Sequence, residues 1–214
     1  MIENGDVKEL TLIQKDDQRL KELCQDVKDF ENKEFSTGLI NQMQEICFEH
    51  QAFAAAAPQF GINKRFILVI NPTEENKEDE DNCNLLKKYN TTTYFNPKIT
   101  TMKGLQYYYE SCMSIKNTIG KVARPYYIEL AYQDIDGNYH HKIAIDFEAI
   151  VLCHEIDHLD GILFTDKAEK IINNVNLDQR TAIRNKFPRE VIFKDKAFNQ
   201  DNIPIRHRTK IYSK

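Results

Sequence analysis

The strongest chemical signal in the sequence is the run His154-Glu155-Ile156-Asp157-His158. Residues four apart share one face of a helix, so both imidazoles could bind one metal ion. Glu155 lies beside them and could act as a general base toward a water molecule. Apolar residues flank the motif on both sides, which predicts that the histidines face the interior. The alternative is an ordinary pair of helix histidines, because this short pattern also arises by chance.

A catalytic metal site of this type needs a third protein ligand. Several candidates lie downstream of the motif: Asp160, Asp166, Glu169 and His207. None of them completes the H-E-x-x-H-x-x-G-x-x-H pattern of many zinc peptidases. Upstream, Cys112 stands in a polar turn between two strand-like segments, flanked by Ser111 and Ser114. Taken alone, Cys112 favours a structural role; taken with the two histidines, it is the best candidate for the third ligand.

The elements that must position these residues form an α+β pattern. We expect a short helical turn within 16–24, an amphipathic helix over 36–50, strands over 65–70, 126–133 and 139–145, and a helix over 147–159. The last of these helices carries the histidines. The sequence therefore predicts small antiparallel sheets packed around one central helix, with an N-terminal helix and a C-terminal helix or tail.

Three further segments give conflicting or weaker signals. The alanine-rich stretch 52–59 has helical propensity, but Pro58 pushes the residue before it toward extended backbone. Residues 94–99 are expected to form a short strand that Pro97 breaks. Apolar residues at helical spacing predict a final helix over 171–187.

Composition limits the classes of protein that the chain can represent. Its 214 residues are 41% hydrophobic and 29% charged, which fits one folded domain. No run of eighteen apolar residues is present, so we expect no membrane partner. The polar, acidic start of the chain argues against a secretory signal, and five cysteines without a C-x-x-C pair fit a reducing cytoplasm.

Three segments together resemble the peptide deformylase family. The family motifs G-φ-G-φ-A-A-P-Q, E-G-C-L-S and H-E-x-D-H stand here, in order, as AFAAAAPQ at Ala52–Gln59, ESCMS at Glu110–Ser114 and HEIDH at His154–His158. The resemblance extends over roughly residues 7–168, most of the chain. One such motif would be a weak signal, whereas three in the right order are specific.

The resemblance implies a metal-dependent hydrolase that removes the N-formyl group from the N-terminal methionine of new polypeptides and releases formate. It implies metal ligands Cys112, His154 and His158, the base Glu155, oxyanion donors from the Gln59 side chain and the Met113 backbone, and substrate contacts from Ala54, Ser111 and Arg124. Glu110 and Arg124 could also form an ion pair that fixes the Cys112 loop. One divalent ion is expected, iron(II) in the cell, with zinc, nickel or cobalt as substitutes.

The sequence departs from the family pattern at three glycines. Ala52, Ala54 and Ser111 stand where the family has glycine, while Met113 replaces leucine with little change in volume. If these positions require positive φ, each substitution costs about 1 kcal/mol or more. If glycine merely leaves room for substrate, the added groups narrow the cleft.

The C-terminal part of the chain is basic. Residues 171–214 carry ten lysines and arginines against four acidic residues, within a chain of net charge −4. We expect a deformylase-like catalytic domain over 1–170 with 171–214 as a basic helix or tail of the same domain. That segment could contact ribosomal RNA phosphates, or it could be a solvated helix face and a loose end. Specific DNA binding is not expected, and the acidic run 74–81 is expected to be a solvated insertion.

Two other functions remain open on the sequence alone. A zinc endopeptidase would also use the His154–His158 motif, although its downstream ligand is missing. A binding module that keeps the fold without turnover, on peptides or on the ribosome, would explain the three lost glycines and the basic end of the chain.

Overall fold

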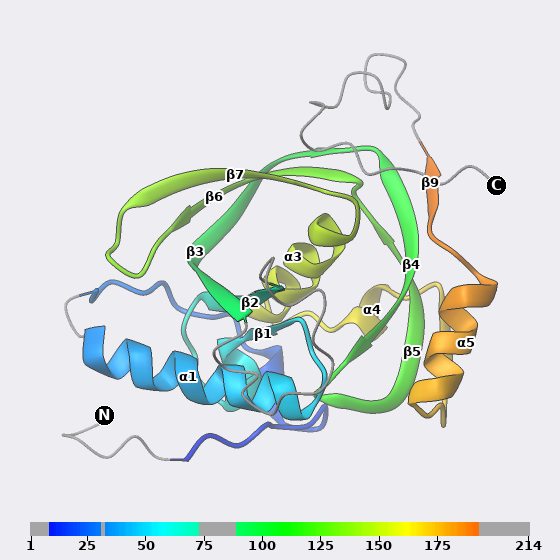
Figure 1. The fold of residues 1–214 in the computed structure, drawn as a ribbon, viewed down its shortest axis with the longest axis horizontal. Helices are drawn as coiled ribbons and strands as arrows, with labels where there is room; N and C mark the ends of the chain where they lie inside the picture. The colour runs from blue at the N-terminus through cyan, green and yellow to red at the C-terminus, as the bar shows by residue number, and fades with distance from the viewer. Residues whose placement is uncertain (1–8, 31–32, 73–88, 193–214) are drawn as a thin grey trace.

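The computed structural model describes residues 9–30, 33–72 and 89–192. Its central element is helix α3 (Asp146–Leu159), and two antiparallel sheets curve around it (Figure 1). Residues of α3 from Ala149 to Leu159 are almost all buried, because the helix contacts protein on most sides. The predicted α+β architecture around a central helix is therefore confirmed.

The first sheet has five strands in the order β1-β2-β3-β6-β7. These strands are β1 (Ala54–Ala56), β2 (Phe66–Pro72), β3 (Tyr89–Lys103), β6 (Tyr127–Gln133) and β7 (Tyr139–Ile145). Alternating side chains such as Ile67, Ile128 and Leu130 face α3 and pack against Leu152 and Ile156 in the main core cluster. The strands thus provide the apolar support that holds α3 in place.

The second sheet has four strands in the order β8-β5-β4-β9. They are β4 (Leu105–Cys112), β5 (Ile115–Arg124), β8 (Lys170–Asn173) and β9 (Glu190–Ile192). β4 and β5 form a hairpin in which Cys112 pairs with Ile115 across a tight turn. Cys112 is therefore the last residue of a strand rather than part of a free loop.

The remaining helices surround the two sheets. They are η1 (Gln18–Lys21), α1 (Lys33–Glu49), η2 (Ala57–Phe60), α4 (Phe164–Lys167) and α5 (Leu177–Lys186). α1 buries Leu39, Met43 and Cys47 in a second core cluster with β2. Among the described helices, none has the length and apolar character needed to cross a membrane.

Pro97 does not end its strand, contrary to the prediction for 94–99. β3 continues from Tyr89 to Lys103, and its register with β6 shifts between Phe95 and Lys98. Asn96 takes a positive φ of 48° at this irregularity. A bulge accommodates the proline because it removes one residue from the hydrogen-bond ladder, so the missing N–H costs nothing there.

The helix predicted over 171–187 is wrong in its first part. Lys170–Asn173 is strand β8, in which Ile172 pairs with Ile119 of β5. Two β-branched residues fit this pleated surface better than a helix. α5 begins later, at Leu177, where the Asn176 side chain accepts a hydrogen bond from the Gln179 backbone N–H.

Two other expectations cannot be compared with the fold. The acidic run 74–81 and the basic end of the chain beyond residue 192 lie outside the described residues. Strand β5, by contrast, is well described and was not anticipated from the sequence. The strand begins with the exposed residues Lys116 and Asn117, and its buried residues Ile119 and Val122 do not form a regular alternating pattern with them.

Candidate active site

The fold brings the two motif histidines and Cys112 together. The Cys112 sulfur and one ring nitrogen from each of His154 and His158 all lie within 4.8 Å of one another. The Cys112 Sγ is 3.3 Å from His158 Nε2. A thiolate and two imidazoles in a buried cluster fit a divalent transition metal, which prefers these soft and borderline ligands.

The downstream alternatives for the third ligand are engaged elsewhere. Asp160 forms an ion pair of 2.6 Å with Arg65, Asp166 one of 2.5 Å with Lys21, and Glu169 one of 3.8 Å with Lys121. His207 lies outside the described residues. Within the described part of the chain, Cys112 is therefore the side chain that completes the cluster.

A chain of buried charges holds His154 in place. Glu110 Oε2 is 2.8 Å from His154 Nδ1, which leaves the other ring nitrogen directed to the cluster. Arg124 donates two hydrogen bonds to Glu110, of 2.7 and 3.0 Å, and a third of 2.5 Å to Asp157. Lys167 donates to the other Asp157 oxygen at 2.6 Å. Such outer contacts fix the orientation of a metal-binding imidazole.

The charges in this network set the protonation of its members. Burial raises the pKa of Glu110, but hydrogen bonds from Arg124 and His154 outweigh burial and lower it to about 2. Burial opposes protonation of His154, while its contacts with Cys112 and Glu110 raise its pKa above the usual value. Burial and the neighbouring His154 lower the pKa of His158. Glu110 is therefore a permanent anion that balances the cationic groups around it.

Glu155 is buried beside the metal-binding cluster. Its Oε2 has no hydrogen-bond partner among the described residues, so one carboxylate oxygen is free. Burial, partly offset by His154, raises the pKa of Glu155 to about 7. A carboxylate with a free oxygen and a pKa near neutrality has the properties of a general base.

Gln59 approaches the cluster from the other side. The alanine-rich segment forms the short strand β1 and then the 3-10 helix η2, which reconciles its conflicting sequence signals. The Gln59 Oε1 accepts a hydrogen bond of 2.9 Å from the Ala56 N–H. Its Nε2 lies 3.3 Å from both Cys112 Sγ and Ser114 Oγ. The amide N–H₂ group is thus aimed at the cluster by a bond to the backbone.

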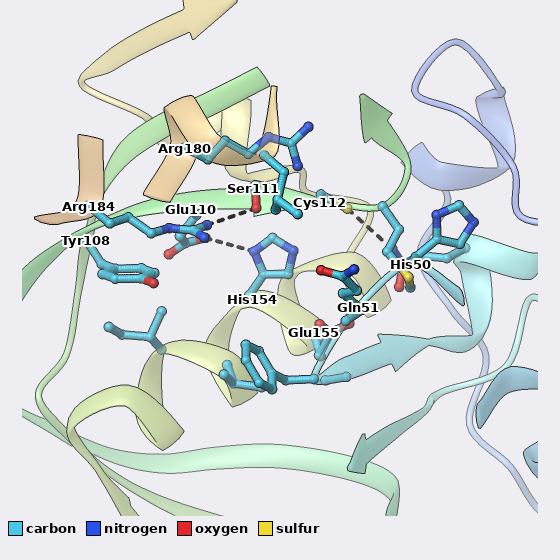
Figure 2. Close-up of a pocket in the computed structure, with 18 of the residues that line it drawn as sticks. His50, Gln51, Tyr108, Glu110, Ser111, Cys112, His154, Glu155, Arg180 and Arg184 are labelled. Carbon is cyan, nitrogen blue, oxygen red and sulfur yellow. Dashed lines mark hydrogen bonds and ion pairs between the residues drawn. The ribbon is translucent and has the colours of Figure 1, made fainter. Parts of the chain in front are cut away.

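These groups open on one cavity of about 330 Å³ (Figure 2). Its lining includes the predicted site residues Ala54, Gln59, Ser111, Cys112, Met113, His154 and Glu155. Phe53, Tyr108, Phe147, Ile150 and Val151 supply an apolar wall. Arg124 and His158 are not part of this lining: Arg124 is hydrogen-bonded to Glu110, and His158 Nε2 lies 3.3 Å from Cys112 Sγ. The position of Arg124 matches its expected ion pair with Glu110 rather than a contact with substrate.

The three replaced glycines cause no backbone strain. None of Ala52, Ala54 and Ser111 has positive φ, so an alanine or serine fits the backbone at each position. All three line the cavity, where their side chains take up space. The Ser111 hydroxyl also gains a partner, because Arg184 Nη2 donates to it at 2.9 Å.

Several lining residues were not found from the sequence. His50, Tyr108 and Lys116 face the cavity, as do Arg180 and Arg184 of α5. The two arginines follow β8 and reach the cavity through long-range packing of α5 beside β4. No local spacing in the sequence signals such a contact.

Comparisons with known proteins all match this chain to the same family. A family model described as polypeptide deformylase matches residues 9–174. A peptide deformylase of Caldicellulosiruptor bescii is 34% identical over 142 residues, which are 66% of this chain and 76% of that protein. A peptide deformylase of Zymomonas mobilis is 31% identical over 164 residues, 76% of this chain and 87% of that one.

Solved structures of the same kind share the fold. A probable peptide deformylase from Synechococcus phage S-SSM7 has a TM-score of 0.65 and 33% identity, covering 74% of this chain and 99% of that chain. A class I type b peptide deformylase from Acinetobacter baumannii, bound to Met-Ala-Ser, has a TM-score of 0.63 and 26% identity over 74% of this chain and 97% of its own. Neither a zinc endopeptidase nor a binding module is favoured by these matches.

Proposed function

The chain belongs to the polypeptide deformylase family, and on this premise we propose which of its residues carry the removal of the N-formyl group from the N-terminal methionine of new polypeptides. One observation supports the assignment above the others. Glu155 presents a free carboxylate oxygen to the cavity beside Cys112 and His154, and that cavity is large enough for a peptide end. Hydrolysis of a small amide at the floor of this cavity follows from that arrangement.

Cys112, His154 and His158 would hold the metal. A divalent ion bound there supplies a Lewis acid that polarises the formyl carbonyl and makes water acidic enough to react near neutral pH. The family resemblance implies iron(II) as the ion in the cell, and one thiolate and two imidazoles also suit zinc, nickel or cobalt as substitutes. Glu110 and Arg124 act as positioning residues, since they hold His154 from behind.

Glu155, Gln59 and Met113 would carry the remaining chemistry. Glu155 accepts the proton of the attacking water on its free oxygen and passes it to the departing amine, leaving formate and a free N-terminus. The Gln59 amide and the Met113 backbone N–H donate hydrogen bonds to the oxyanion that forms at the formyl carbon. Gln59 needs little rearrangement, because its bond to Ala56 already fixes the amide.

The apolar wall would bind the methionine side chain. Phe147, Ile150 and Val151 offer an apolar surface, while Ala54 and Ser111 border the path of the peptide. The Met-Ala-Ser peptide in the Acinetobacter baumannii relative supports a methionine-led peptide as the bound product. We assign the activity to the cytoplasm. We also propose that the basic segment 171–214 is the part of the chain that would contact the ribosome.

Formate release tests this function. Protein loaded anaerobically with iron(II), or with nickel, is assayed with a short formylmethionyl peptide, and metal content is measured in parallel. Glu155→Gln should lower kcat by about 10² to 10⁴-fold while retaining one metal ion per chain. Glu148→Gln is the matched control, since Glu148 lies on the same helix and pairs with Lys142 at the surface.

Two results would contradict the proposal. Undiminished formate release by Glu155→Gln would remove the assigned base. Cleavage of internal peptide bonds without formate release would assign the site to peptidase chemistry instead.

A further inference from the structure

α5 contributes two arginines to the cavity, and one of them is firmly held. Arg184 Nε donates a hydrogen bond of 2.9 Å to the Tyr109 carbonyl, and its Nη2 donates one of 2.9 Å to Ser111. Its guanidinium also lies 5.3 Å from the centre of the Tyr108 ring. Arg184 therefore anchors α5 to β4, and the serine that replaces a family glycine is one of its two hydrogen-bond acceptors.

Arg180 lies one helical turn earlier and has no comparable partner. Its Nε is buried without a hydrogen-bond partner among the described residues. Figure 2 shows its side chain extending from α5 on the Ser111 side of the cavity. Burial and the like charge of Arg184 lower the pKa of Arg180. Arg180 is partly buried, and an anionic ligand would give its buried Nε the hydrogen-bond partner that it lacks.

The cavity offers no spare anion on that side. Its acidic lining residues are Glu110 and Glu155. Glu110 is committed to Arg124 and His154, and Glu155 is assigned to the reaction. Lys116 adds a further basic group to the lining. The α5 side of the cavity is therefore positively charged and faces the space that a bound peptide would enter.

We propose that Arg180 is a specificity-determining residue that binds a carboxylate of the substrate peptide beyond its formylmethionine. The inference rests on the proposed function, and it concerns an element outside residues 9–174 that the family model matches. Two sources could supply the carboxylate, an aspartate or glutamate side chain in the residues after methionine, or the free C-terminus of a short peptide. A planar guanidinium suits either one, since it can donate two parallel hydrogen bonds.

Peptide pairs that differ in one charge test the proposal. Formyl-Met peptides with aspartate or asparagine at the second or third position, all amidated at the C-terminus, are compared by kcat/KM. The native chain should prefer an aspartate peptide by about tenfold at low salt, the value of one charge-assisted contact, and less at high salt. In Arg180→Gln this ratio should fall to about one, and Arg180→Glu should prefer lysine peptides.

Lys186→Gln is the matched control. It removes the same charge from the same helix, but Lys186 lies over the Phe187 ring and does not line the cavity. It should therefore keep the native ratio. If Lys186→Gln lowers the ratio as much as Arg180→Gln does, the preference reflects overall charge and the proposal is overturned.

A binding measurement separates this proposal from the catalytic one. Deformylated Met-Asp and Met-Asn peptide amides are titrated into the metal-loaded protein by calorimetry, which requires no turnover. Tighter binding of the aspartate peptide, lost in Arg180→Gln, supports the role of Arg180 even if no peptide releases formate. The free-acid forms of the same peptides are titrated in parallel, and tighter binding of a free acid than of its amide, lost in Arg180→Gln, also supports the role and identifies the terminal carboxylate as the source. Equal binding of the aspartate and asparagine amides, together with equal binding of the free acids and their amides, would overturn it.

Discussion

The two ends of the cavity are built on different principles. At the metal-binding end, buried charges are joined in a continuous network, with Glu110 and Arg124 each 3% exposed. At the α5 end, Arg184 is held by a strand while Arg180 has a buried nitrogen without a partner. At the first end the charged groups are already paired with one another, whereas at the second end the Arg180 Nε lacks a hydrogen-bond partner among the described residues.

This contrast separates chemistry from recognition. Ligand geometry must hold within a fraction of an ångström, so the groups behind His154 are locked by several hydrogen bonds. Recognition of a peptide beyond its first residue tolerates more variation, because it adds to binding without touching the reacting atoms. All three replaced glycines, Ala52, Ala54 and Ser111, line the cavity, and Ser111 is the one of the three that is hydrogen-bonded to α5.

Breaking the buried network should have the largest effect. Arg124→Met removes the partner of two buried carboxylates, Glu110 and Asp157. We expect the free energy of unfolding to fall by about 3–5 kcal/mol, because Glu110 and Asp157 stay buried with His154 and Lys167 as their remaining charged partners. Urea denaturation followed by circular dichroism measures the change.

Arg65→Met is the control for Arg124→Met. Arg65 pairs with Asp160, whose side chain is 37% exposed, so water can replace the lost contact. The loss should stay near 1 kcal/mol or below. Equal destabilisation by the two variants would contradict the distinction between a locked network and an open surface.

Removing the Gln59 amide should leave the fold intact and slow the reaction. Gln59→Ala deletes the group whose N–H₂ lies 3.3 Å from Cys112 Sγ. We expect kcat to fall by about 10²-fold, the usual value of one oxyanion donor, with metal content unchanged. Gln51→Asn is the control, since Gln51 lines the same cavity and its positive φ of 53° suits asparagine. A change in KM alone would assign Gln59 to binding rather than to the oxyanion.

The same contrast explains how far the sequence could predict the site. Helix spacing predicts that His154 and His158 share one face, and the family resemblance adds Cys112, which the β4–β5 hairpin places beside them. The fold class followed from the same periodicities. The contact of Glu110 with His154 was not anticipated, since it joins a strand and a helix through a charge network.

The α5 side was missed for a physical reason. The apolar pair Ile171 and Ile172 fits both a helix and a strand, and only the pairing with β5 decides between them. A helix predicted over β8 shifts the expected start of α5, and Arg180 and Arg184 are then expected on a solvated basic face. Strand pairing and helix docking are long-range events, and a local pattern does not encode them.

The Ser111 hydroxyl offers the smallest and most discriminating change. Ser111→Ala removes one acceptor of Arg184, and we expect about 1 kcal/mol less stability, because one hydrogen bond to a charged group is lost at a half-buried site. Amide hydrogen exchange should rise in α5 and stay constant in α3. Ser111→Gly restores the family residue and loses the same bond, so it should loosen α5 equally.

Comparison of these two variants distinguishes the hydrogen bond of Ser111 to Arg184 from the volume that its side chain occupies in the cavity. If Ser111 acts through Arg184, both variants should lose part of the preference for acidic peptides, because the Arg180 guanidinium is then less well placed. If its side chain matters as bulk in the cavity, Ser111→Gly should raise kcat/KM for a neutral peptide above that of Ser111→Ala. We expect the first result, since Ser111 has no positive φ and its hydroxyl is bonded to α5. Unchanged exchange in α5 in both variants would show that the Tyr109 carbonyl alone holds Arg184.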